Sequence, residues 1–281
     1  MNVNTLSAIA NIISNPISEL RSFYEGRNRI NNMGAALETY VMDLFAGTLN
    51  ESDEQKRNRR YSQTFSYTGN QNNPPDMVIH KGDAIEVKKI ENPSASLALN
   101  SSYPKAKLLV TDTKINDNCR TCEDWSEKDI LYAIGVAKGR CLTKLFFVYG
   151  VDYAASASVY ERISKVIKDG IHEIPDLELA NTQELGRVNR VDPLGITYLR
   201  IRGMWGIENP VKVFSYVYTP PNKEFEFAAI INTEKYESFP VVDREKLEAV
   251  TDTNFKITDV EIKNPNNPAK LKHAKLITFN R

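Results

Sequence analysis

Apolar residues recur at helical spacing through the first fifty positions of the chain. Leu6, Ile9 and Ile12 lie three residues apart, and their run ends at Pro16, because proline disfavours helical geometry in the residue before it. We therefore expect helix within residues 1–26, broken at Pro16. A second helix is predicted over 35–49, where one apolar stripe consists of Leu37, Tyr40, Val41, Leu44 and Phe45.

Residues 76–90 contain two short apolar runs of the kind that form β-strands. We predict a hairpin with strands at 76–80 and 84–90. Gly82 lies in its turn, because glycine permits the positive φ that tight turns need. The same reasoning predicts further strands at 61–67, 129–138, 142–149, 197–205, 211–218, 224–231, 255–262 and 270–279.

Two intervening segments differ in character from the strands. Residues 51–60 pass from acidic to basic and predict a solvated loop. Residues 156–168 predict an amphipathic helix with Val159, Ile163 and Val166 facing inward. We see no internal repeat and no linker that divides the chain. The pattern therefore predicts strands and helices in one α/β unit.

Composition narrows the functional class only a little. Lys plus Arg and Asp plus Glu number 36 each in 281 residues, so no overall positive charge indicates nucleic acid, although a local cluster would suffice. No stretch is long and apolar enough for a membrane span. The three cysteines argue against a disulfide framework, and we expect a cytoplasmic protein. Cys119 and Cys122 have zinc-ligand spacing without a second pair, so free thiols are the default and a structural zinc is the alternative.

Asp76, Glu86 and Lys88 are the candidate catalytic group. Because side chains alternate along a strand, Glu86 and Lys88 leave one face of the sheet, and a closed hairpin brings Asp76 near them. The two carboxylates suit Mg²⁺, which activates water and offsets phosphate charge. Lys88 would position or deprotonate that water and touch the phosphate. This predicts a phosphodiester-cleaving site, but the pattern is common by chance, so a hairpin with solvated charges is the alternative.

Glu38 lies at the edge of the apolar stripe of the second helix, one residue after Leu37. It is either a solvated helix carboxylate or a further carboxylate of the metal site.

Candidate DNA contacts fall in three segments. The loop after the hairpin concentrates hydrogen-bond donors and two lysines, and both a basic loop and a late strand carry arginines. In each segment an ordinary turn or a cross-strand salt bridge is the alternative. The residues are Asn100, Ser101, Ser102, Lys105 and Lys107 in the first segment, Arg187 and Arg190 in the second, and Arg200 and Arg202 on one face of the third.

At the level of whole motifs the chain resembles the PD-(D/E)XK nuclease superfamily. A Glu-bearing helix is followed by Pro75-Asp76, nine intervening residues and Glu86-Val87-Lys88. The surrounding segments resemble the NgoPII-type type II restriction endonucleases over most of the chain. Those segments are 31–45, 75–79, 86–89, 99–105, 192–196 and 200–205.

The resemblance implies a restriction-endonuclease-like α/β core, with a mixed β-sheet flanked by helices and additional C-terminal strands. It implies a single domain over 1–281, with 1–180 as catalytic core and 181–281 as a strand-rich part that contributes to DNA recognition. Asp76 and Glu86 would hold Mg²⁺, Lys88 would be the catalytic lysine, and Glu38 matches the helix carboxylate of the superfamily.

The same resemblance implies cleavage of double-stranded DNA at a short GC-rich palindrome, with GGCC the leading candidate, and a companion DNA methyltransferase. It also implies a homodimer, since a palindrome mirrors a two-fold axis. Two alternatives are a repair or recombination nuclease of this superfamily and a DNA-binding protein that keeps the fold without catalysis.

Overall fold

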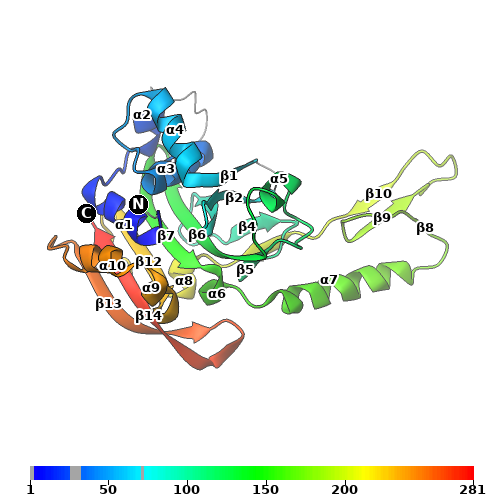
Figure 1. Cartoon of the computed structure of the whole chain (residues 1–281). Helices are drawn as coiled ribbons and strands as arrows, with labels where there is room; N and C mark the ends of the chain where they lie inside the picture. Colours follow the sequence, from blue (N-terminus) through cyan, green and yellow to red (C-terminus); the bar gives the residue numbers. More distant parts are fainter. Residues whose placement is uncertain (1–2, 26–32, 71–72) are drawn as a thin grey trace.

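A mixed β-sheet runs through the centre of the molecule (Figure 1). The computed structural model describes residues 3–25, 33–70 and 73–281, so Asn31 and Asn32 of the first family segment lie outside it. The strand order is β1-β2-β3-β6-β7-β12-β14-β13, with β5 paired to β6. β3 is parallel to β6 and β12 is parallel to β7, whereas the other neighbours are antiparallel.

The strands of this sheet are β1 (Phe65–Asn70), β2 (Asn73–Ile79), β3 (Ala84–Ile90), β5 (Lys107–Leu109), β6 (Glu127–Lys138), β7 (Cys141–Tyr149), β12 (Glu226–Asn232), β13 (Phe255–Asn264) and β14 (Asn267–Asn280). The predicted α/β class with a mixed sheet is confirmed. The C-terminal strands β12, β13 and β14 extend this same sheet.

Helices cover both faces of the sheet, because strand residues alternate between two apolar layers. One layer joins Met77, Ile85 and Phe147 to α1 (Thr5–Ser14), α2 (Leu20–Glu25), α3 (Met33–Ala46), α9 (Thr233–Ser238) and α10 (Val241–Glu248). The other layer joins Val78 and Tyr132 to the region of α5 (Asp117–Arg120), α6 (Gly150–Tyr153) and α8 (Pro210–Val213). Among the described residues, no helix combines the length and the apolar character that crossing a membrane requires.

Three predicted segments are wrong, wholly or in part, for local reasons, and the strand expected at 197–205 is interrupted between Ile201 and Trp205. Residues 51–60 do not form a loop throughout, because Asp53 accepts hydrogen bonds from the amides of Gln55 and Lys56 and so caps α4 (Glu54–Thr64). That helix also takes the first half of the strand expected at 61–67. The strand expected at 211–218 is instead α8 and turns, begun by the cap at Asn209 with proline in the first turn.

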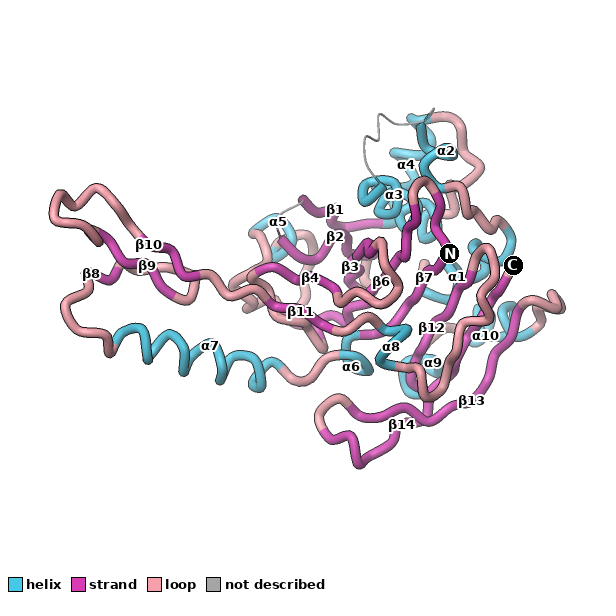
Figure 2. The backbone as a smooth tube through the Cα atoms, turned by 180° about the vertical axis from the view of Figure 1, so that it is seen from behind, coloured by secondary structure: helices cyan, strands magenta, loops and turns pink. Residues whose placement is uncertain are grey.

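Residues 155–204, which we call the arm, extend away from the sheet (Figures 1 and 2). The arm contains α7 (Ala157–His172) and a small antiparallel sheet, β8 (Glu178–Leu179), β9 (Gly186–Asn189) and β10 (Leu199–Ile201). The chain returns through β11 (Trp205–Ile207), which pairs with β4 (Leu97–Asn100). The helix predicted at 156–168 is present, but Val159, Ile163 and Val166 do not face inward: they are 41%, 41% and 65% exposed.

Gly150, the first residue of α6, permits a close approach between the start of that helix and the loop between β4 and β5. A Cβ atom here would collide with the carbonyl oxygen of Lys105 and lie 2.6 Å from that of Ala106. Both contacts are with backbone, so neither can be relieved by turning a side chain. Gly150 therefore helps to set the position of the loop between β4 and β5.

We expect Gly150→Ala to lower the free energy of unfolding by about 1–3 kcal/mol, the usual range for overpacking a core. Chemical denaturation measures this change. Gly206→Ala is the control, because its added Cβ would meet the Leu97 carbonyl oxygen at an ordinary 3.5 Å. Equal stability of the two variants would show that the close approach at Gly150 is not needed.

Candidate active site

The β2–β3 hairpin brings Asp76 alongside strand β3. The strands pair in antiparallel register, with Met77 opposite Ile85. The amide of Val87 donates a hydrogen bond of 2.6 Å to Oδ2 of Asp76. This bond holds the Asp76 carboxylate beside the part of strand β3 that carries Glu86 and Lys88, the residues before and after Val87.

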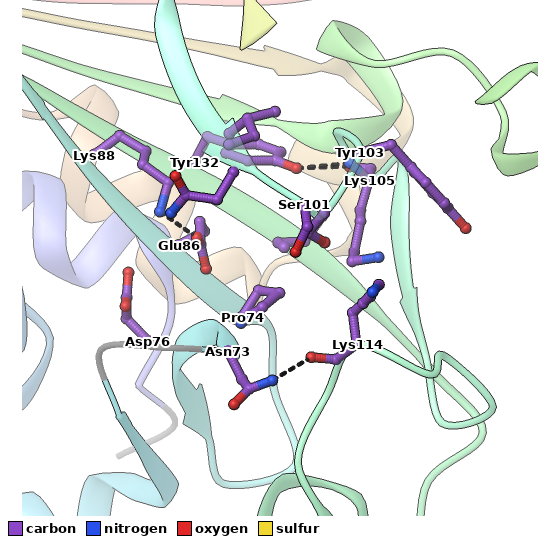
Figure 3. A pocket seen from close by; sticks show the side chains of 14 residues that line it. Asn73, Pro74, Asp76, Glu86, Lys88, Ser101, Tyr103, Lys105, Lys114 and Tyr132 are labelled. Carbon is purple, nitrogen blue, oxygen red and sulfur yellow. Dashed lines mark hydrogen bonds and ion pairs between the residues drawn. The ribbon is translucent and has the colours of Figure 1, made fainter. Parts of the chain in front are cut away.

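Glu86 and Lys88 point toward one another, as the spacing in strand β3 predicts. Nζ of Lys88 donates to Oε1 of Glu86 at 2.5 Å, and the side chain of Glu86 is only 9% exposed. Figure 3 shows this pair with Asp76 on the same side of one pocket. The structure therefore brings together the three residues of the predicted catalytic group.

Glu38 lies on α3, is half-buried, and is close enough to Glu86 and Lys88 to feel their charges. Burial raises the pKa of the Glu38 carboxyl, and the charge of Glu86 raises it further. Within 3–25, 33–70 and 73–281, however, no three His, Cys, Asp or Glu side chains are grouped closely enough to form a metal site. Glu38 is thus an electrostatic neighbour of the pocket, and its role as a metal ligand stays a prediction.

Burial and like charge shape the protonation of the pocket. Burial raises the pKa of Asp76 well above its ordinary range, and the charge of Glu86 raises it further, against the opposing effect of Lys88. Burial alone would lower the pKa of Lys88, but Glu86 and Asp76 more than compensate, so that pKa is raised. Lys88 is therefore a cation at neutral pH, and the carboxylates repel one another.

The donor set fits a hard divalent cation. Asp76 and Glu86 offer carboxylate oxygens, the ligand type that Mg²⁺ prefers. Oε2 of Glu86 is buried and has no hydrogen-bond partner among the described residues, and an unsatisfied buried oxygen of this kind is destabilising. A cation bound there would satisfy this oxygen and relieve the repulsion between the carboxylates.

The predicted contacts in the loop after β4 lie in different environments. Asn100, Ser101, Ser102 and Lys105 line the pocket, with Ser102 Oγ buried and unpaired among the described residues. The Lys105 side chain is buried, and its ammonium pairs with Asp112 and lies 4.5 Å from the centre of the Tyr103 ring. Lys107 lies outside the pocket lining and pairs with Glu127 at 2.5 Å.

The four predicted arginines lie on the arm and not in the catalytic pocket. Arg187 lies over the Tyr198 ring, 4.8 Å from its centre, and Arg190 approaches Glu178 at 3.5 Å. Arg200 and Arg202 both pair with one carboxylate, that of Glu184, through contacts that include 2.9 Å for each Nε. Arg200 and Arg202 therefore form salt bridges, as the alternative interpretation predicts. Their contact with DNA stays a prediction.

Lys114 is a pocket residue that sequence reasoning missed. It lines the catalytic pocket and also a neighbouring cavity of about 380 Å³. That cavity lies between the segment after β4 and the arm, and Arg202 is one of its lining residues. Burial lowers the pKa of Lys114, and the nearby charge of Lys168 lowers it further. No motif marks this lysine, because only the fold brings residue 114 back to the β2–β3 hairpin.

The cysteines are free in the structure. Cys119 is buried, and burial together with the neighbouring Cys122 raises the pKa of its thiol to about 12. The thiol is therefore protonated at neutral pH in the metal-free protein, and the absence of a structural zinc stays a prediction.

We expect Asp76→Asn to stabilise the metal-free protein at neutral pH. When folding raises the pKa of a carboxyl, the folded protein becomes less stable as the pH rises from the unfolded pKa through the folded pKa of that group. The amide cannot ionise, and its oxygen can still accept from Val87. A gain of about 1 kcal/mol would raise Tm by about 2–4 °C. In thermal melts, the difference in Tm between the variant and the wild type should become smaller as the pH falls toward the ordinary pKa of aspartate. A lower Tm for the variant than for the wild type at neutral pH would contradict this account.

Comparison with known proteins identifies the family. The family model described as NgoPII restriction endonuclease matches residues 3–263. The chain is 51% identical over 279 residues to a Neisseria gonorrhoeae protein named Type II restriction enzyme NgoPII, and the match covers 99% of each chain. No solved structure matches the chain. The chain therefore belongs to the NgoPII restriction endonuclease family.

Proposed function

We propose that this protein hydrolyses phosphodiester bonds in double-stranded DNA at a short GC-rich palindrome, with Mg²⁺ as cofactor and as a homodimer. GGCC is the leading candidate site. The observation that carries the proposal is the convergence of Asp76, Glu86 and Lys88 in one pocket of a chain from a restriction endonuclease family. The full chain, 1–281, would act as one nuclease domain, and its expected cytoplasmic placement is part of the proposal.

Asp76 and Glu86 would hold the metal, with Glu38 as an outer carboxylate. When bound, Mg²⁺ supplies Lewis-acid chemistry toward water and phosphate. The amide of Val87 orients the Asp76 carboxylate, and the ion pair with Lys88 orients that of Glu86. Because its raised pKa keeps Lys88 protonated, its ammonium would bind the scissile phosphate and orient the attacking water as a hydrogen-bond donor.

Guanine reading is assigned to Arg200 and Arg202. Arginine can pair with O6 and N7 of guanine through two hydrogen bonds, which is the commonest specific contact in the major groove. In the free protein Glu184 holds both guanidinium groups through hydrogen bonds and ion pairs. Binding to bases would therefore have to replace these contacts, which makes Glu184 a competitor for the reading residues.

Membership of a restriction endonuclease family favours this function over a repair nuclease, and the presence of Asp76, Glu86 and Lys88 favours it over a DNA-binding protein without catalysis. A companion methyltransferase would protect the same palindrome in the host DNA. A nuclease that cuts at DNA structures or ends would produce heterogeneous products, and a protein without catalysis would produce none.

We expect Asp76→Ala, Glu86→Ala and Lys88→Ala each to reduce the cleavage rate by about 10³-fold or more, because the first two remove a metal ligand and the third removes the cation that contacts the phosphate. Binding to the same duplex in Ca²⁺ should stay measurable. Lys89→Ala is the matched control, since Lys89 is next in strand β3 but pairs with Glu91. Robust cutting by any of the three variants would remove that residue from the mechanism, and a wild-type rate for Glu38→Gln would make Glu38 a solvated helix carboxylate.

Substitution of the arginines should change the preference for the specific DNA sequence, which can be measured separately from cleavage. If Arg202 reads guanine, Arg202→Ala should reduce the ratio of specific to random binding by about tenfold, as expected for roughly 1–3 kcal/mol of discrimination. Lys114→Ala, which removes a cation beside the pocket, should weaken binding to both duplexes and reduce its salt dependence. Competition binding at two salt concentrations measures both effects. An unchanged ratio for Arg200→Ala and Arg202→Ala would place base reading elsewhere.

A further inference from the structure

The arm carries most of the large apolar side chains that the described residues leave exposed, those between Val159 and Met204. Isolated apolar side chains on a surface are ordinary, but a concentration of them indicates a surface that binds a partner. Helix α7 holds the most regular part of this surface.

Neither face of α7 packs on the core of its own chain, since even Lys165 on the polar side is 74% exposed. Its polar face, with Glu161, Lys165 and Lys168, lines the cavity beside the catalytic pocket. Its opposite face carries Val159, Ile163, Val166 and Gly170 at spacings of four, three and four, with Ile167 beside them, which we call the α7 stripe. Val166 is 65% exposed and Ile167 is 42% exposed.

Contacts within the chain hold α7 at its ends and leave the stripe open. Near its start, the Tyr160 ring lies 5.3 Å from that of Tyr103 and 5.5 Å from that of Trp205. Near its end, Ile171 is buried close to Gly186. In both views of the chain, no described element lies along the outer side of the helix between these anchors (Figures 1 and 2).

We propose that the α7 stripe binds the α7 stripe of a second copy of this chain, with the two helices antiparallel about a two-fold axis. Alternating spacings of three and four are those of helix pairs that pack knobs into holes. In the antiparallel arrangement Ile163 meets the partner's Val166, and Val159 meets the partner's Gly170, where the absence of a side chain permits close approach. By symmetry each contact forms twice.

Charge along the stripe favours the same arrangement. Arg162 and Asp169 lie seven residues apart and border the stripe on the same side. The antiparallel pairing places Arg162 opposite the partner's Asp169, and the two-fold axis repeats the pair. Asp169 is bonded to Lys165 at 2.6 Å within its own helix and is 57% exposed, so it can accept a second cation. One acidic and one basic border residue suit a second copy of the helix better than an anionic lipid surface, which favours lysine and arginine.

This interface rests on the proposed function only in one respect: a palindromic DNA site would be bound by two copies of the chain. The contact itself follows from α7. Because the other face of the helix lines the cavity next to the catalytic pocket, pairing would also fix one wall of that cavity in each copy.

Sedimentation equilibrium of the full chain, without DNA or metal, tests the interface independently of cleavage. We expect a dimer, and we expect Val166→Glu to raise its dissociation constant at least about tenfold, since a charge would be buried at the centre of the contact. Val242→Glu on α10 is the matched control, because Val242 is 58% exposed but lies outside the arm. A monomer at all concentrations, or equal dissociation constants for the two variants, would overturn the proposal.

A charge exchange tests the antiparallel direction. Arg162→Asp and Asp169→Arg should each weaken the dimer, and the double variant should recover most of the loss, because the two border charges are then exchanged on both copies. A double variant weaker than either single variant would exclude the pairing. A dimer through α7 that fails to cut DNA would contradict the proposed function and leave the interface intact, whereas cutting by a monomer would contradict the interface.

Discussion

The hydrogen bond from the Val87 amide to the Asp76 carboxylate is the contact on which the catalytic geometry depends. It joins the two strands of the hairpin at the point where Glu86 and Lys88 leave strand β3, and so places Asp76 next to the ion pair that these two residues form. The arrangement is electrostatically unfavourable in the free protein, because burial and the charge of Glu86 together raise the pKa of Asp76 despite the opposing charge of Lys88. The surrounding sheet, with Met77 and Ile85 in its core, holds these groups in place despite their repulsion.

The hairpin could be predicted from the sequence because its causes are local. The apolar runs on either side of the turn predict the strands. The residue with positive φ in that turn is Lys81 (φ 54°) and not Gly82, so the expected role of Gly82 is wrong. Glu86 and Lys88 share a face because strands have a period of two. The site has a second part that is not local: Lys114 and Ser102 reach the pocket through the fold, and no spacing rule relates them to the hairpin.

The errors have physical causes of the same kind. In residues 51–60 the charge run suggested a loop, but the Asp53 cap supplies acceptors for the first amides of α4 and allows a helix. For α7 the periodicity was predicted correctly and the burial was not. Amphipathic spacing shows that Val159, Ile163 and Val166 share a face, but it does not show whether that face packs on the same chain. Here the polar face borders the cavity beside the catalytic pocket, and the apolar face is exposed.

The central claim is that this pocket makes a metal-dependent cut at one fixed sequence. Its most direct test is digestion of a fully sequenced phage DNA by the wild-type protein with and without Mg²⁺, followed by sequencing of the fragment ends. The account predicts discrete fragments that depend on Mg²⁺, with the same short GC-rich palindrome at every end on both strands. Ends at unrelated sequences, or fragments formed equally well without a divalent metal, would contradict it.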